Sequence, residues 1–189
     1  LDYNILYSLG ILYKESDSSV FLPTYGGVLL FCDYPQKFLP HCIIRIHNHN
    51  NTLSSPIIIC DGNILDMLNY AANIINICKP PSIPIEVIED LLGNSVVHRD
   101  YFFINTPIEV YIKEDSIEII NPGFKKHRDN TETYIRRNMW LYLKLLSLDS
   151  TKRFYNKSIK AKSYSNNEIT IRYYNIKVKN LFKVVVKYK

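Results

Sequence analysis

A chain of 189 residues is long enough for one sizeable domain or two small ones. Its apolar fraction of 47% and charged fraction of 22% are typical of a globular protein and exclude an intrinsically disordered one. No stretch approaches the roughly 20 apolar residues of a membrane helix, and the N-terminus lacks the pattern of a signal peptide. We therefore expect a cytoplasmic protein with no membrane partner. Because Leu1 falls inside an expected helix, we also expect the chain to continue upstream.

Charge is divided unevenly along the chain. Residues 152–189 hold eleven Lys or Arg against one acid, Glu168, whereas the rest of the chain is acidic. A basic segment of this kind attracts the phosphate backbone of a nucleic acid. The alternative is that alternating lysines shield the exposed edge of a sheet from association.

The first part of the chain predicts a helix followed by strands. Apolar residues recur at helical spacing over 1–13. Residues 19–35, with Pro23 and two glycines as punctuation, predict a strand pair or one buried strand. We expect further strands over 42–50 and 56–62.

Two helices are expected next. Residues 63–79 predict a helix that Asn63 or Asp61 caps and that a Pro-Pro pair ends. A second helix should cover 84–98, with apolar residues on one side. On a neighbouring face of this helix Asp90, Asn94 and His98 recur every four residues and form a polar ladder.

The remaining elements complete an α+β chain. Alternation over 107–123 predicts a β-hairpin. Asp129 and Glu132 resemble a capping box for a third helix that carries Trp140. Residues 157–188 predict two or three strands. The expected fold is therefore a mixed or antiparallel sheet with helices on one face.

A motif search excludes several enzyme classes. His98-Arg99-Asp100, with Asn105 five residues later, matches the catalytic loop of a protein kinase. The Gly-rich loop and the DFG motif that phosphoryl transfer requires are missing, so the match is accidental. We expect Arg99 and Asp100 to pair locally or to brace the following loop. No P-loop and no GxSxG sequence occurs, which leaves a P-loop motor or a conventional hydrolase without support.

Two groups of side chains remain as candidates for metal binding. His47 and His49 lie two apart on an expected strand, so they are either half of a metal site or surface histidines. In the polar ladder, the carboxylate of Asp90 and the amide oxygen of Asn94 suit a hydrated magnesium ion. The alternative is a polar helix flank that faces solvent. The four cysteines form no CxxC pair, which indicates free thiols.

Two longer stretches resemble a known family. Residues 89–123 (EDLLGNSVVHRDYFFINTPIEVYIKEDSIEIINPG) resemble the RecG-related C-terminal domain of transcriptional regulators. That domain is a divergent member of the histidine-kinase, gyrase and Hsp90 (GHKL, HATPase) type of ATP-binding fold. Residues 21–46 (FLPTYGGVLLFCDYPQKFLPHCIIRI) are similar to the end of the Schlafen/AlbA-like DNA-binding domain that precedes it.

The resemblance gives the polar ladder a function. It implies that Asp90 replaces the catalytic glutamate of such ATPases and that Asn94 holds magnesium against the nucleotide phosphates. His98, Asn121 and Gly123 would complete the nucleotide site. However, no glycine follows Gly123, so the glycine-dependent phosphate lid of an active ATPase is missing. We therefore expect a degenerate domain without a cofactor and without catalysis.

These observations lead to one leading hypothesis and two alternatives. The domains would be 1–62 (end of the Schlafen/AlbA-like domain), 63–150 (RecG-related domain) and 151–189 (its basic β-rich extension). We expect a transcriptional regulator that binds DNA through its tail, where tyrosines alternate with basic residues. The alternatives are an ATP and Mg²⁺ binding module or weak ATPase, and a structural domain that forms homodimers through its sheet edge. The expected nucleic-acid contacts are Lys157, Lys160, Lys162, Arg172, Lys177 and Lys179.

Overall fold

The computed structural model describes residues 2–124, 137–155, 161, 164, 166 and 168–189. It confirms the α+β class, with a six-stranded sheet of order β4-β3-β5-β6-β8-β7. All neighbouring strands are antiparallel except β3 and β5, which are parallel. The main elements are α1 (Tyr3–Ser8), β1 (Leu12–Tyr13), β2 (Leu22–Pro23), α2 (Tyr25–Phe31), β3 (Ile44–Asn48), β4 (Ile57–Cys60), α3 (Ile64–Cys78), α4 (Ile85–His98), β5 (Ile108–Ile112), β6 (Ser116–Pro122), α5 (Met139–Ser147), β7 (Ile169–Ile176) and β8 (Leu181–Tyr188).

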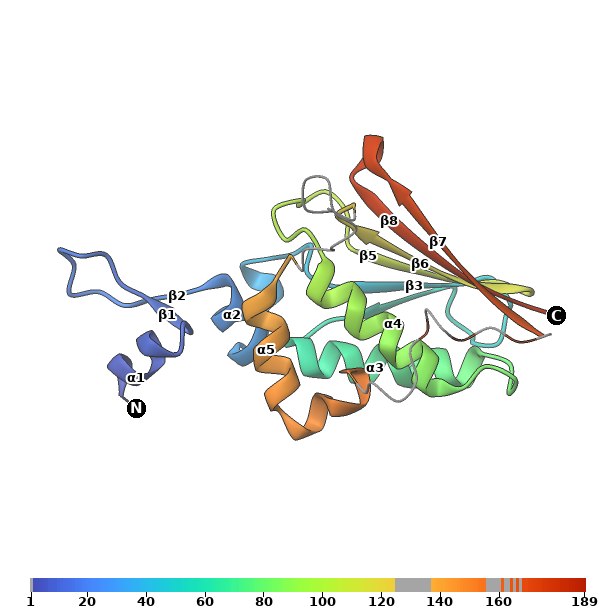
Figure 1. Ribbon diagram of the computed structural model, residues 1–189, viewed down its shortest axis with the longest axis horizontal. Helices are drawn as coiled ribbons and strands as arrows, with labels where there is room; N and C mark the ends of the chain where they lie inside the picture. The colour runs from blue at the N-terminus through green and yellow to red at the C-terminus, as the bar shows by residue number, and fades with distance from the viewer. Residues whose placement is uncertain (1, 125–136, 156–160, 162–163, 165, 167) are drawn as a thin grey trace.

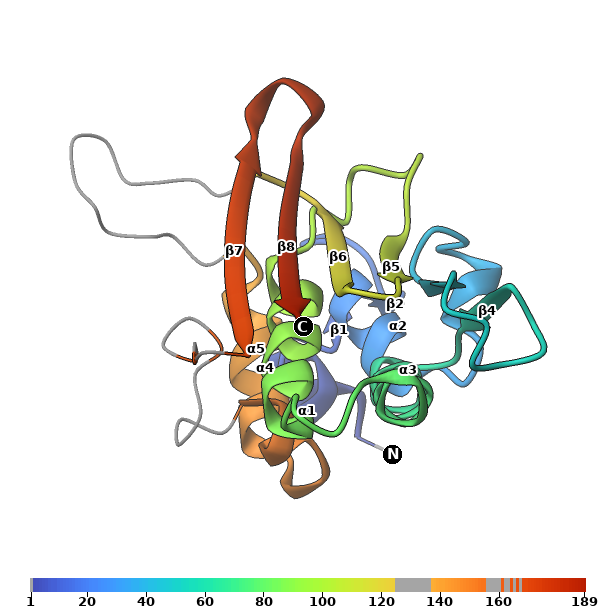
Figure 2. The ribbon, with the colours of Figure 1, turned by 90° about the vertical axis from the view of Figure 1, so that its right-hand side faces the viewer.

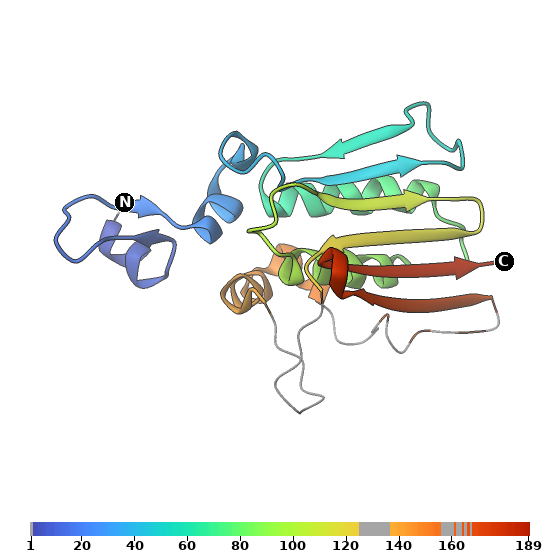
Figure 3. The same cartoon turned by 90° about the horizontal axis from the view of Figure 1, so that it is seen from above.

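Helices cover one face of the sheet. Figure 1 shows α3 and α4 packed below the strands, with α5 beside α4. The core lies between these layers: Ile44, Val110, Ile119 and Val186 of the strands are buried in one apolar cluster with residues of α3 and α4. No described element covers the opposite face of the sheet, which Figure 3 views directly. In the described part of the chain, no helix has both the length and the apolar character needed to cross a bilayer.

The predicted helices 63–79 and 84–98 are confirmed as α3 and α4. Asn63 caps α3, because its side-chain oxygen accepts hydrogen bonds from the N–H groups of Leu65 and Asp66. The helix ends at Cys78, two residues before Pro80. Helix α4 begins after Pro84, and nine of its residues, among them Val87 and Leu92, are buried.

The hairpin predicted over 107–123 is present, and the predicted tail strands form a second hairpin with an unexpected position. β5 and β6 pair as the alternation indicates, with Val110 opposite Ile119. Two tail strands, β7 and β8, form the second hairpin, which Figure 2 shows at the end of the sheet. Its later strand lies inside the sheet: β8 pairs with β6 on one side and with β7 on the other.

The prediction for residues 19–35 is wrong, because the longest element in this stretch is helix α2, and the strand β2 covers only Leu22–Pro23. Thr24 caps the helix by accepting a hydrogen bond from the N–H of Gly27. Gly26 and Gly27 signal tight packing here, not a turn between strands. A Cβ on Gly26 would lie 2.3 Å from the Trp140 ring, and one on Gly27 would lie 2.2 Å from the Ile11 carbonyl oxygen.

The helix expected over 1–13 is shorter than predicted. Helix α1 ends at Ser8, and Gly10 follows with a φ of 71°. Figure 1 shows α1, β1 and β2 projecting from the body as an arm. Trp140 ties this arm to α5 by donating a hydrogen bond to the carbonyl oxygen of Leu9. The third predicted helix is present as α5, but its expected cap residues, Asp129 and Glu132, lie outside the described residues.

Candidate functional site

The polar ladder is present on α4. Asp90, Asn94 and His98 are partly exposed and follow one flank of the helix, beside the buried face. The Asp90 carboxylate accepts a hydrogen bond of 3.2 Å from the N–H of Ala161. Burial, together with the charge of Asp90, raises the pKa of Tyr173 to about 12. The acid therefore lies close to the tail segment and to β7.

Asn121 and Gly123 lie at the end of β6. Asn121 shares the helix-covered face of β6 with Ile117 and Ile119, and only 3% of it is exposed. Its side-chain oxygen has no hydrogen-bond partner, which is costly for a buried acceptor. Gly123 has a φ of 111°, and a Cβ there would lie 3.0 Å from the backbone nitrogen of Asp100. This close approach explains the glycine.

A hollow of about 380 Å³ lies elsewhere, between α2 and the start of α5. Aromatic rings of Tyr25, Phe102 and Trp140 line it, together with Arg137. None of Asp90, Asn94, His98 and Asn121 lines this hollow. The polar ladder and the hollow are therefore separate features of the described chain.

The His-Arg-Asp sequence braces the loop after α4, as predicted. Arg99 is fully buried and donates hydrogen bonds to the carbonyl oxygens of Thr106, at 2.7 Å, and Phe103, at 3.4 Å. Its guanidinium lies beside the buried thiol of Cys42, and burial raises the pKa of that thiol to about 11. Both side chains are therefore packed into the core.

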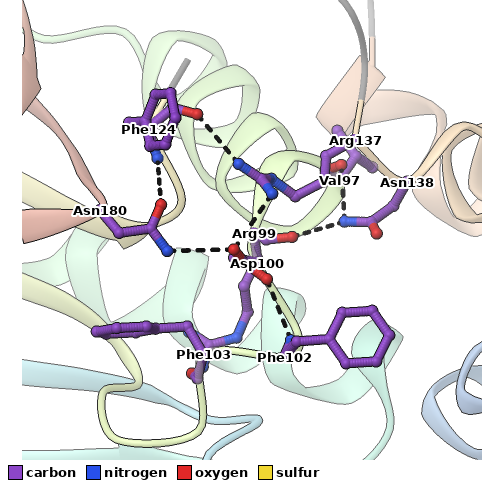
Figure 4. Close-up of polar contacts among 9 residues, drawn as sticks. All are labelled: Val97, Arg99, Asp100, Phe102, Phe103, Phe124, Arg137, Asn138 and Asn180. Atoms are coloured by element: carbon purple, nitrogen blue, oxygen red, sulfur yellow. Dashed lines mark hydrogen bonds and ion pairs between the residues drawn. The ribbon is translucent and has the colours of Figure 1, made fainter. Parts of the chain in front are cut away.

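Asp100 joins three segments that are far apart in the sequence (Figure 4). One carboxylate oxygen accepts the N–H of Phe102 at 3.2 Å. The other lies 3.2 Å from the guanidinium of Arg137, which precedes α5, and 3.1 Å from the side-chain nitrogen of Asn180, in the β7–β8 turn. We call Asp100, Arg137 and Asn180 the carboxylate hub. Its role is structural.

His47 and His49 lie on the uncovered face of the sheet. The rings of His47 and Tyr111 are stacked, with centroids 4.4 Å apart and planes 5° from parallel, and His49 lies 6.0 Å from the same tyrosine. The His47 ring nitrogen is 2.7 Å from the Glu109 carboxylate. Among the described residues, no cluster of three or more His, Cys, Asp or Glu could hold a metal ion. The histidines are therefore part of a ring stack on the sheet.

The uncovered face carries two acids that are flanked by basic side chains. Glu109 lies between Arg45, at 3.4 Å, and His47. Glu118 lies between Lys113, at 2.9 Å, and Lys183, at 2.8 Å. Burial acts to raise the pKa of Glu118, but the hydrogen bonds and charges of the two lysines outweigh it and hold this pKa below its ordinary value.

The acids lie deeper than their partners. The side chains of Glu109 and Glu118 are 11% and 13% exposed, whereas those of Arg45 and Lys113 are 37% and 42% exposed. The outer layer of this face is therefore cationic. We call it the basic face: the outward residues of β3, β5, β6, β8 and β7, namely Arg45, His47, Glu109, Tyr111, Lys113, Glu118, Ile120, Lys183, Val185, Lys187, Arg172 and Tyr174, with His49 just beyond β3.

The predicted nucleic-acid contacts of the tail lie in different parts of the chain, and their role in binding stays a prediction. Arg172 lies on the basic face, and Lys177 and Lys179 lie in the exposed turn between β7 and β8. No acid among the described residues lies within 4 Å of these three cations. The remaining three predicted contacts lie outside the described residues: Lys157, Lys160 and Lys162.

Most of the tail tyrosines are packing residues. Tyr155 and Tyr188 are buried, and Tyr173 points toward the helices because it pairs with buried Val184. Tyr174, which is 42% exposed, is the tail tyrosine on the basic face. Its strand, β7, is an outer strand of the sheet, as the dimerisation hypothesis requires, and that hypothesis stays a prediction.

Several residues of the basic face were missed by the sequence prediction. Tyr111 and Lys113 belong to the predicted hairpin, whose alternation separates them from the buried residues, but they were not linked to the tail. Lys183 and Lys187 lie in the predicted tail strands. The missing information was the insertion of β8 beside β6, which brings Lys183 to Glu118.

Comparisons with family models, with curated proteins and with solved structures found no match. The function is therefore argued from this chain's own residues.

Proposed function

We propose that this is a regulatory, nucleic-acid-binding protein whose basic face is the binding surface, built on a degenerate GHKL-type domain without catalysis of its own. The observation that carries the proposal is the arrangement of charge on the uncovered sheet face, where the acids lie beneath the cations. Glu109 lies beneath Arg45, and Glu118 lies beneath Lys113 and Lys183. The outer N–H groups of these three cations remain available to an anion. A surface of this kind attracts a polyanion such as DNA.

The position of the cations favours this function over simple protection of the sheet edge. Edge protection requires charges on the outer strands. Here Arg45 lies on β3, Lys113 directly follows β5, and Lys183 lies on β8. Each of these strands is paired on both sides. Their charges therefore make the face of the sheet basic and do not protect its edges. Arg172, Lys177 and Lys179 extend the same positive surface toward the β7–β8 turn.

The salt dependence of DNA affinity tests the proposal. We expect the affinity to fall at least about tenfold between about 50 and 200 mM salt, because each phosphate contact releases condensed counterions. Replacing Arg172, Lys177 and Lys179 together by alanine should weaken binding and reduce the slope of log K against log salt by about 2 to 3. Fluorescence anisotropy with labelled DNA measures both quantities.

A matched triple variant provides the control. Lys14, Lys37 and Lys152 lie away from the basic face, on the arm, after α2 and beside α5. Their replacement by alanine removes the same net charge and should leave the salt slope nearly unchanged. A flat salt response of the wild type, or equal losses in the two triple variants, would contradict the proposal.

One observation favours ATP and Mg²⁺ binding as a second candidate function. Asn121 presents a buried amide oxygen without a hydrogen donor, on the sheet face that α4 covers. A nucleobase amino group is a suitable donor for such an oxygen. Asn94, on the flank of α4, would then hold the magnesium ion and Asp90 would lie one turn before it.

Calorimetric titration with ATP and Mg²⁺ tests this candidate. If the site binds nucleotide, the wild type gives a saturable binding heat, and Asn94→Ala or Asn121→Leu weakens binding at least about tenfold. Asn4, exposed on helix α1 of the arm, supplies the control Asn4→Ala, which should bind as the wild type does. Absence of heat from the folded wild-type protein would eliminate this function.

A further inference from the structure

The width of the basic face bears on whether it binds double-stranded or single-stranded nucleic acid. The face spans strands β3, β5, β6, β8 and β7, and neighbouring strands are about 4.8 Å apart. Its width is therefore roughly 20 Å, which is greater than the roughly 12 Å of the DNA major groove. A helix or a two-stranded ribbon can enter that groove, whereas a sheet face of this width does not fit into it.

Aromatic rings lie among the cations of this face. Tyr111 forms a near-parallel group with His47 and His49, and His49 is exposed at one side of it. Tyr174 is 42% exposed on the outer strand. Aromatic side chains beside a basic groove stack the unpaired bases of single strands and cannot reach the paired, stacked bases inside a duplex.

The two aromatic positions are spaced for an extended strand. Tyr111 is on β5 and Tyr174 is on β7, three strand spacings away in the order β5-β6-β8-β7. The separation across the sheet is therefore about 14 Å. Lys183 and Arg172 lie in the same part of the face as Tyr174: Lys183 is its partner across the β7–β8 pair, and Arg172 is two residues earlier on the same strand. Tyr111 is in register with Arg172 through Glu118 and Val185, so the two tyrosines are offset by two residues along the strand direction. The strands that carry these rings and cations lie side by side in Figure 3.

We propose that the basic face binds single-stranded nucleic acid, with bases stacked at the Tyr111–His49 group and at Tyr174 and with phosphates held by Lys113, Lys183 and Arg172. This inference rests on the proposed function and specifies its ligand. The strand runs across the β-strands, from β5 toward the β7 edge, and neither the hollow beside Trp140 nor the polar ladder takes part in binding.

Binding of matched oligonucleotides tests the inference. Fluorescein-labelled 15-nucleotide oligothymidine and oligouridine are compared with a 15-base-pair duplex by anisotropy at one salt concentration. We expect either single strand to bind at least about tenfold more tightly than the duplex. Tyr174→Leu and Tyr111→Leu should each weaken single-strand binding by roughly 5- to 100-fold, because each removes a stacking surface. Duplex binding should change less than about twofold.

Ring-preserving variants and an unrelated tyrosine provide the controls. Tyr174→Phe and Tyr111→Phe keep the ring and should bind single strands within about twofold of the wild type. Tyr34 is 63% exposed after α2, away from the basic face, and Tyr34→Leu should also bind normally. Because Tyr174 is exposed on an outer strand, its variants are expected to fold, and thermal unfolding of each variant checks this.

The outcomes distinguish a failure of this inference from a failure of the proposed function. If the duplex binds as tightly as the single strands, and the leucine variants bind normally, the inference is overturned while nucleic-acid binding stands. If the folded protein binds neither form, both are overturned. If Tyr34→Leu loses as much affinity as Tyr174→Leu, stacking on the basic face is rejected.

Discussion

Replacing Asp100 by alanine is expected to lower the free energy of unfolding by about 3 kcal/mol, because the hub loses its only acceptor for two donors. The Asp100 and Arg137 side chains are 18% and 19% exposed, so their ion pair is largely shielded from solvent. Without the carboxylate, the guanidinium of Arg137 and the amide of Asn180 face each other with no acceptor between them. Urea unfolding monitored by circular dichroism measures the loss.

Local hydrogen exchange distinguishes the hub from a general loss of stability. The N–H of Gly123 donates to the Asn180 carbonyl at 2.7 Å, and that of Phe124 donates to the Asn180 side-chain oxygen at 3.2 Å. Both amides should exchange faster in Asp100→Ala, more than those of α3 do. Asp61→Ala removes an exposed carboxylate and should change stability by less than about 0.5 kcal/mol. Equal stabilities of the two variants would contradict the role of the hub.

Replacing Gly93 by alanine is expected to destabilise the protein by about 2 to 3 kcal/mol, although the same change stabilises an isolated helix by up to about 1 kcal/mol. Gly93 is buried in α4, where a Cβ would lie 2.5 Å from the carbonyl oxygen of Phe154 and 3.0 Å from its Cβ. The Tyr155 hydroxyl donates to the Gly93 carbonyl at 3.3 Å, so the contact involves two successive residues of the 3-10 segment that follows α5 (Asp149–Tyr155). That segment would have to move away from α4.

Asn94→Ala is the matched control for this prediction. It lies next to Gly93 on the same helix but is partly exposed, so the gain in helix propensity should leave stability nearly unchanged or slightly higher. Thermal and urea unfolding of both variants give the comparison. If Gly93→Ala stabilises the protein as it would an isolated helix, the close contact between α4 and the 3-10 segment is not present in solution.

The parts of the fold that were predicted from the sequence depend on local signals. Helix α3 has its cap at Asn63 and its stop at Pro80, and the β5–β6 hairpin has strict alternation, so both were predicted within a few residues. The polar ladder on α4 follows from helical spacing alone. In each case the determining residues are neighbours along the chain.

The parts that could not be predicted depend on distant partners. Gly26 was interpreted as a turn glycine because nothing nearby shows that Trp140 fills the space beside it. The hub joins residues up to 80 positions apart, Asp100 and Asn180. The basic face likewise requires the strand order, since Lys183 meets Glu118 only when β8 lies beside β6. Periodicity assigns a residue to a face but does not determine which strands are neighbours.

The place of β8 has a consequence for how the chain is made on the ribosome. β8 is the last described strand, yet it fills the gap between β6 and β7. Until residues 181–188 have left the exit tunnel, the backbone edge of β6 has no neighbour there and could pair with another nascent chain. The nascent protein therefore depends on residues 181–188 for a continuous sheet, and a chain that terminates before β8 should aggregate instead of forming a smaller folded domain.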